Sequence, residues 1–158
     1  MKIVDWALVL ATLAAACVLG YLLPQLVAEA GGAQPFDLRP LGYNVMQARV
    51  YLQDLSPVGL ALYQGGFRLT DTIFPILFTL TLCLPLRGRG EIWFFPALAY
   101  GLCDLAENLA VARLLQTGPE VAAQAVLLAS GFSQAKTFAL IAALLLALFG
   151  MLQAWRHR

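Results

Sequence analysis

Residues 100–115 read YGLCDLAENLAVARLL and place two acids and an amide, Asp104, Glu107 and Asn108, inside an apolar run. The chain has 158 residues, of which 61% are hydrophobic and 12% are charged. An average soluble domain has ~25% charged residues, and one of this length leaves too much surface in water to hide so many apolar side chains. We therefore expect an all-α integral membrane protein with these polar residues buried between its helices.

Four apolar stretches are long enough to cross a membrane, since a spanning helix needs ~20 mostly apolar residues. They cover residues 3–28, 58–86, 91–115 and 121–155. The second stretch follows Ser56-Pro57, a helix N-cap with proline at the first helical position. The sequence therefore predicts a single transmembrane domain, residues 1–158, built as a four-transmembrane-helix bundle.

The N-terminal stretch has an alternative interpretation as a cleaved signal that ends at Cys17. A signal peptide has a basic leader and a short apolar core that stops at a small-residue cleavage site. Here Asp5 interrupts the leader, and apolar residues continue to Val27. We therefore expect this stretch to remain as the first span.

Several classes of site are excluded by the residue types present. The three cysteines stand singly in apolar segments, so no CxxC redox or zinc motif exists. The only histidine, His157, lies in the C-terminal tail, which removes Ser-His triads, histidine metal sites and haem ligation. The motifs G-x-S-x-G, H-E-x-x-H and Walker A are missing. We expect no cofactor and, with a net charge of +1 and no basic tract, no nucleic-acid partner.

Basic residues near the span ends predict the orientation, because cytoplasmic ends carry an excess of Lys and Arg. If there are four spans, the basic side carries Lys2, Arg87, Arg89, Arg156 and Arg158. On the other side, the basic residues Arg39, Arg49 and Arg113 are diluted by the acids Glu29, Asp37, Asp54 and Glu120. The tryptophans, which anchor at interfaces, also map to the basic side. We expect both termini in the cytoplasm and the protein in a bacterial inner (cytoplasmic) membrane.

The first outer loop, residues 30–56, is the only connection with room for structure of its own. A short amphipathic helix is predicted from Asn44 to Leu55, because Asn44 is a good N-cap residue. Its apolar residues, expected on the membrane surface, are Val45, Met46, Leu52 and Leu55. The loop is either a flap over a site beneath it or a plain surface linker.

Polar residues of three predicted spans reach one layer of the membrane. At 1.5 Å per helical residue from the cytoplasmic ends, the heights are ~22 Å for Asp71, ~20 Å for Asp104, ~24 Å for Glu107 and ~28 Å for Lys136. Arg68 lies one turn above Asp71 on the same face. The spacing therefore predicts a buried charged cluster in the outer-leaflet half.

Such a cluster is a functional candidate, because each charge inside a membrane costs ~2.5–3.5 kcal/mol and buried ion pairs add little stability. Two cations against three acids leave one negative charge, which a shared proton, a bound cation or a cationic ligand group could neutralise, and the proton is the cheapest of the three. The candidate catalytic residues are Asp71, Asp104, Glu107 and Lys136. The candidate ligand-binding residues are Arg68, Tyr100, Asn108, Ser133 and Gln134.

The function predicted from this cluster is the binding of a membrane lipid or an amphipathic small molecule, with enzymatic action left open. In an enzyme, Asp104 or Glu107 would act as general acid or base. Arg68 and Lys136 would hold a phosphate or carboxylate. The orienting side chains would be Tyr100, Asn108 and Ser133.

Other functions stay open beside this one. The charges could join the helices of a structural or accessory subunit in a larger membrane complex or homo-oligomer, or form a proton or ion relay. Ser133 and Lys136 have the S-x-x-K spacing of a Ser-Lys hydrolase, without its accompanying motifs. The oxygen ligands would also suit Mg²⁺ or Ca²⁺, but two nearby cations oppose this, and we predict no metal.

Four expected spans with acids inside the membrane resemble the architecture of the emopamil-binding and sigma-2 proteins. No residue role is taken over from that resemblance.

Overall fold

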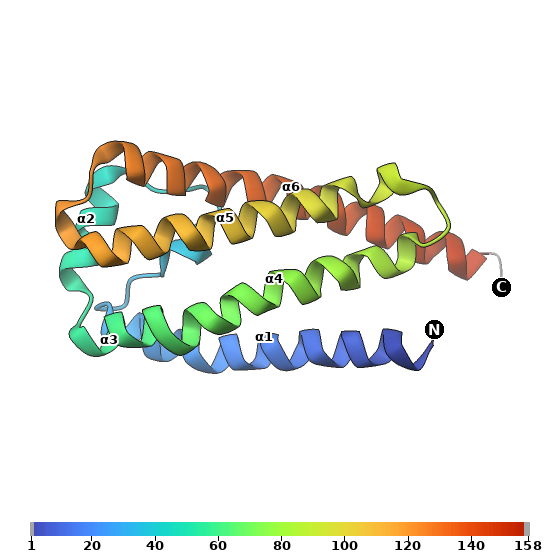
Figure 1. Ribbon diagram of the computed structural model, residues 1–158, viewed down its shortest axis with the longest axis horizontal. Coiled ribbons are helices and arrows are strands. Elements are labelled where there is room, and N and C mark those ends of the chain that lie inside the picture. Colours follow the sequence, from blue (N-terminus) through green and yellow to red (C-terminus); the bar gives the residue numbers. More distant parts are fainter. Residues whose placement is uncertain (1, 157–158) are drawn as a thin grey trace.

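The computed structural model describes residues 2–156, and every regular element in that range is a helix. The four long helices of this range lie side by side (Figure 1). They are α1 (Ile3–Glu29), α4 (Arg68–Cys83), α5 (Phe95–Thr117) and α6 (Ala123–Arg156). The start of α1 and the end of α6 lie at one end of the molecule, which we call the terminal end (Figure 1). The all-α prediction is confirmed. Arg158, used in the orientation argument, and His157, used to exclude histidine-based sites, lie outside the described residues.

Three segments are long and apolar enough to cross a membrane. They are Ile3–Glu29, Pro57–Leu86 and Ala123–Arg156. Helix α5 has 23 residues but is not among them, and it carries Asp104, Glu107 and Arg113. The predicted membrane character is thus confirmed for three of the four expected spans, and α5 as a fourth span stays a prediction.

The second span is broken, although the sequence predicted one continuous helix over 58–86. It starts as predicted, with the Ser56 side chain accepting a hydrogen bond from the Gly59 N–H at 3.0 Å and Pro57 in the first turn. After the short α3 (Pro57–Leu62), a π-helical turn covers Tyr63–Phe67 and Gly65 leaves helical geometry. Helix α4 then begins in a new direction, because a glycine pair is a weak point in a helix.

The helices pack in chain order, which leaves α1 and α6 on opposite flanks. α5 packs most extensively on α6, α4 packs on α5, and α1 packs mainly on α4. The seam between α1 and α4 includes a hydrogen bond of 2.8 Å between the hydroxyls of Thr12 and Thr81. The short 3-10 turns η3 (Leu84–Leu86) and η4 (Glu91–Phe94) connect α4 to α5 at the terminal end.

The predicted loop helix exists as α2 (Val45–Asp54), at the end opposite the termini (Figure 1). Asn44 caps it as predicted, with its side chain accepting from the Gln47 N–H at 2.9 Å. The helix packs through Ala48, Tyr51 and Leu52, which are buried. The predicted membrane-facing set is therefore wrong for Leu52, while Met46 is exposed. The loop forms a packed cap on the bundle.

Candidate functional site

Lys136 lies at the centre of the predicted charged cluster. Its ammonium group contacts Glu107 Oε2 and lies 3.4 Å from Asp104 Oδ1. The two acids are three residues apart on α5 and so share the face that packs on α6. All three side chains are largely buried, with exposed fractions of 13%, 0% and 7% for Lys136, Glu107 and Asp104. The convergence predicted from residue heights is present between α5 and α6.

Ser133 belongs to the same network, one turn before Lys136 on α6. Its hydroxyl donates to Glu107 Oε1, and its side chain is fully buried. Glu107 therefore contacts the hydroxyl with one oxygen and the ammonium with the other. Because the Ser133 proton goes to a carboxylate and two acids hold Lys136, the geometry does not form a Ser-Lys pair in which the amine takes the serine proton.

Asp71 and Asn108 join α4 to this centre. The Asn108 side-chain amide donates to the Asp71 backbone carbonyl at 2.8 Å. Within residues 2–156, no hydrogen bond or ion pair reaches the Asp71 carboxylate. Arg68, one turn earlier, lines a narrow crevice with Asp71 but forms no ion pair with any acid in the same residue range. Among the residues described, the Asp71 carboxylate therefore has neither a hydrogen-bond nor an ion-pair partner.

A fourth acid, Asp37, reaches the cluster from the outer loop. It lies in the 3-10 turn η1 (Phe36–Leu38) and is only 7% exposed. Tyr63 holds it, because the phenol donates to Asp37 Oδ2 at 2.5 Å and accepts from the Phe36 N–H at 3.0 Å. From the sequence, Asp37 was expected only on the non-cytoplasmic side, and its place in a charged cluster was not predicted. In the sequence, Asp37 follows an aromatic residue and stands between two prolines, in a loop long enough to fold back on the bundle. No other sequence feature pointed to its role.

The loop is fixed on α6 by hydrogen bonds beside the cluster. The Tyr43 N–H donates to Ser130 Oγ at 2.8 Å, and the Gln134 amide donates to the Leu41 carbonyl at 3.1 Å. Between these contacts Gly42 has φ of +78°, and an added Cβ there would lie 2.4 Å from Ser130 Oγ. Only glycine allows both the conformation and the approach. Gln134, predicted to bind ligand, therefore holds the loop in this structure.

A cavity of about 260 Å³ brings the acids of three elements together beside Lys136. Asp37, Asp71, Asp104 and Lys136 line its polar part. Its apolar part is lined by Leu19 and Leu23 of α1, Phe74 of α4 and Leu140 of α6. Tyr100 also lines it and packs edge-on against Phe78. Glu107, Asn108 and Ser133 stand behind the cavity wall and do not line it.

The residues described show no group of three or more His, Cys, Asp or Glu side chains placed to hold a metal ion. Lys136 occupies the position between Asp104 and Glu107 that a cation would need. Compared with protein-family models, curated proteins and solved structures, the chain matches none.

Asp37 is expected to make stability depend on pH. Burial raises the pKa of its carboxyl, while the positive charge of Lys136 and the Tyr63 hydrogen bond oppose the rise. The folded chain then keeps a proton at Asp37 that the unfolded chain releases above about pH 4. The free energy of unfolding should therefore fall as the pH rises from about 4 through the raised pKa.

Asp37→Asn should remove this part of the pH dependence. Denaturant unfolding in detergent, run from about pH 4 to about pH 8, should show wild type gaining stability relative to the variant as the pH falls. Parallel pH curves for the two proteins would contradict the assignment. Asp54→Asn, at an exposed acid of α2, is the matched control.

Proposed function

We propose that this chain is a four-span membrane protein that binds a lipid or amphipathic small molecule in the cavity beside Lys136. The observation that carries the proposal is the lining of that cavity, where three acids and a lysine face apolar side chains from α1, α4 and α6. An amphiphile has the matching division into a polar head and an apolar body. Ligand pockets usually measure ~300–1,000 Å³, so this cavity suits a head group and the first part of a chain.

The polar part of the cavity offers both signs of charge. Lys136 can attract a phosphate or carboxylate oxygen, and its position is fixed by Asp104 and Glu107. The Asp71 carboxylate, which lacks a partner among residues 2–156, can accept a hydrogen bond from the head group. In the enzymatic form of the proposal, Asp71 and Asp104 exchange a proton with the bound molecule. Glu107 lies behind the wall and acts as a positioning residue.

The charges inside the predicted membrane region also favour a binding site over a cluster that only holds the helices together. Replacing a buried ion pair by apolar residues is often neutral or stabilising. A bundle that needed only cohesion would therefore gain little from Asp104, Glu107 and Lys136. Ionisable side chains inside a membrane are rare and usually mark binding sites or proton paths.

The fourth span, α5, is supported by the distribution of its side chains. Its polar residues Asp104, Glu107 and Asn108 are buried, whereas Leu98, Leu102 and Leu109 are at least half exposed. The helix thus turns an apolar surface outward, as a lipid-facing span must. Four spans also agree with the position of both chain ends at one end of the bundle (Figure 1), and the basic residues there favour the cytoplasmic side of an inner membrane.

Cysteine labelling tests this topology. In a variant without native cysteines, single cysteines at Gln34 and Glu120 should react with an impermeant reagent in intact cells. A cysteine at Glu91 should react only after the membrane is opened, because it lies on the cytoplasmic side if there are four spans. All three positions are exposed in the fold. Equal labelling of Glu91→Cys and Glu120→Cys in intact cells would show that α5 does not cross.

Mass spectrometry of the molecules that co-purify with the protein tests the binding site. Asp104→Asn should reduce the retained ligand at least tenfold, since one lost contact to a charged group costs ~1.5–3 kcal/mol. Asp54→Asn should retain it. Because Asp104→Asn also weakens the Lys136 ion pair, a second variant is needed that leaves the charges intact.

Gly20→Leu supplies that variant. Gly20 lines the cavity from α1, and no neighbouring atom lies within 4 Å of an added Cβ. A leucine there should occupy the cavity while it stabilises the helix, since helical glycine costs ~1 kcal/mol relative to alanine. Gly131→Leu is the control, at an exposed glycine of α6 outside the cavity. Ligand lost in Gly20→Leu and kept in Gly131→Leu supports binding, whereas equal ligand in both favours the scaffold function.

A further inference from the structure

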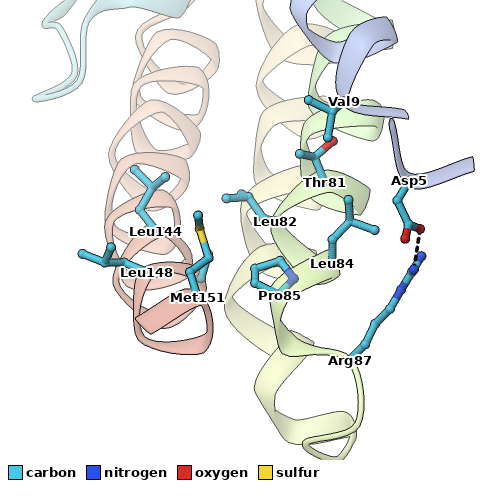
Figure 2. Close-up of a pocket in the computed structure, with 11 residues that line it drawn as sticks. Asp5, Val9, Thr81, Leu82, Leu84, Pro85, Arg87, Leu144, Leu148 and Met151 are labelled. Carbon is cyan, nitrogen blue, oxygen red and sulfur yellow. Dashed lines mark hydrogen bonds and ion pairs between the residues drawn. The ribbon is translucent and has the colours of Figure 1, made fainter. Parts of the chain in front are cut away.

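Two apolar cavities flank α4 at the terminal end, and they share no lining residue with the cavity beside Lys136. The first, about 600 Å³, lies between α4 and α6, with Val9 of α1 at its edge (Figure 2). The second, about 410 Å³, lies toward α5 and is lined by Leu8, Leu80 and Leu98 among others. Both volumes fall in the ~300–1,000 Å³ range of ligand pockets. The two cavities thus lie on either side of the seam between α1 and α4.

Among residues 2–156, Arg87 alone lines both cavities. It directly follows the 3-10 turn η3, and its side chain is 59% exposed. Its Nη1 lies 2.5 Å from Asp5 Oδ1, a contact drawn in Figure 2. A guanidinium group has five N–H donors in a planar fork, so the pairing with Asp5 leaves donors for a second anion. The cavities therefore meet at a cation with unused hydrogen-bonding capacity.

We propose that these cavities hold the two acyl chains of one anionic phospholipid, with its phosphate on Arg87. The first cavity extends from Met151 to Leu144 along α6, which at 1.5 Å per residue is about 10 Å. The phosphate lies where α4 ends, and the upper part of each acyl chain runs along one side of it. This site is separate from the cavity beside Lys136 and does not rest on the function proposed for that cavity.

Charge selects an anionic lipid over a zwitterionic one. The residues described at this end include the cations Lys2, Arg87, Arg89 and Arg156 and the acids Asp5 and Glu91. Asp5 already pairs with Arg87, and the net charge of these residues is positive. The choline group of phosphatidylcholine adds a positive charge to this positive region, whereas the glycerol head group of phosphatidylglycerol adds none. A single-chain lipid fills only one of the two cavities.

Native mass spectrometry of the detergent-solubilised full chain tests the proposal with three added lipids. Palmitoyl-oleoyl phosphatidylglycerol should bind at least tenfold more tightly than lyso-phosphatidylglycerol or palmitoyl-oleoyl phosphatidylcholine. Asp5→Asn frees the guanidinium and should bind phosphatidylglycerol at least as tightly as wild type. The double variant Asp5→Asn/Arg87→Gln removes both partners and leaves no unpaired buried acid. It should lose the preference for phosphatidylglycerol over phosphatidylcholine.

Single tryptophans test the two cavities one at a time. Met151→Trp fills the first and Leu98→Trp the second, and each should weaken phosphatidylglycerol binding about tenfold, the effect of ~1.4 kcal/mol. Their controls are Leu152→Trp and Leu102→Trp, at exposed positions that line neither cavity. Lyso-phosphatidylglycerol should tolerate either substitution, because the other cavity stays open.

Three results would overturn the proposal. The first is equal phosphatidylglycerol binding by Asp5→Asn and the double variant. The second is the absence of any difference between the cavity tryptophans and their controls. The third is a lipid-free dimer that the cavity tryptophans dissociate, which would assign the cavities to a second copy of the chain.

Discussion

Lys136→Met should lower the free energy of unfolding by about 3–5 kcal/mol, the usual cost of removing one partner of a buried ion pair. The ammonium of Lys136 is the cation that the structure places between Asp104 and Glu107. Without it, two largely buried carboxylates face one another with no positive charge between them. Denaturant unfolding in detergent measures the loss, and Arg113→Met, at an exposed cation of the same bundle, should change stability by less than ~0.5 kcal/mol.

Glu107→Gln should cost less, about 1.5–3 kcal/mol for a lost contact to a charged group. Asp104 still holds Lys136, and the new amide oxygen can still accept from Ser133. The double variant Glu107→Gln/Lys136→Met should be more stable than the sum of the two losses predicts, by about 0.5–3 kcal/mol. Strictly additive losses would mean that the two side chains do not interact. If the cluster is a binding site, the double variant should fold and yet retain no ligand.

This ion pair could be predicted from the sequence because it depends only on regular helix geometry. A fixed rise per residue gives Glu107 and Lys136 similar heights on neighbouring antiparallel helices. Their spacing from Asp104 and Ser133 then puts all four on facing sides. The caps at Asn44 and Ser56 could be predicted for the same reason, since a cap involves residues three positions apart.

The features that the sequence did not predict depend on contacts between residues distant in sequence. The sequence assigned Asp37 only to the non-cytoplasmic side. Its burial arises because the loop folds back, and the Tyr63 hydroxyl, 26 positions away, donates a hydrogen bond to it. Gln134, predicted to bind ligand, donates its side-chain amide to the Leu41 carbonyl, a contact with the loop that helix spacing does not reveal. The break at Gly65 was missed because the apolar pattern continues through it. Helix periodicity cannot locate a loop, and one of the four charged residues that line the cavity, Asp37, comes from a loop.

Tyr63→Phe should lower the free energy of unfolding by about 2–6 kcal/mol, because it removes a donor and an acceptor at once. The hydroxyl donates to Asp37 and accepts from the Phe36 N–H, and both of those residues are buried. Each polar group left without a partner in the interior costs ~1–3 kcal/mol. The control is Tyr21→Phe, at an exposed tyrosine of α1, which should stay within ~0.5 kcal/mol of wild type.

The pH dependence of the Tyr63→Phe loss identifies its cause. The phenol's hydrogen bond stabilises the charged form of Asp37 more than the neutral form. Without it, the already raised pKa of Asp37 should rise further. The stability deficit should therefore shrink as the pH falls and Asp37 gains its proton in the folded state. In an Asp37→Asn background the deficit should be smaller at every pH and should not vary with it. A deficit that stays constant with pH in both backgrounds would trace the loss to packing around the ring, and Asp37 would not be the partner that fixes the loop over the cavity.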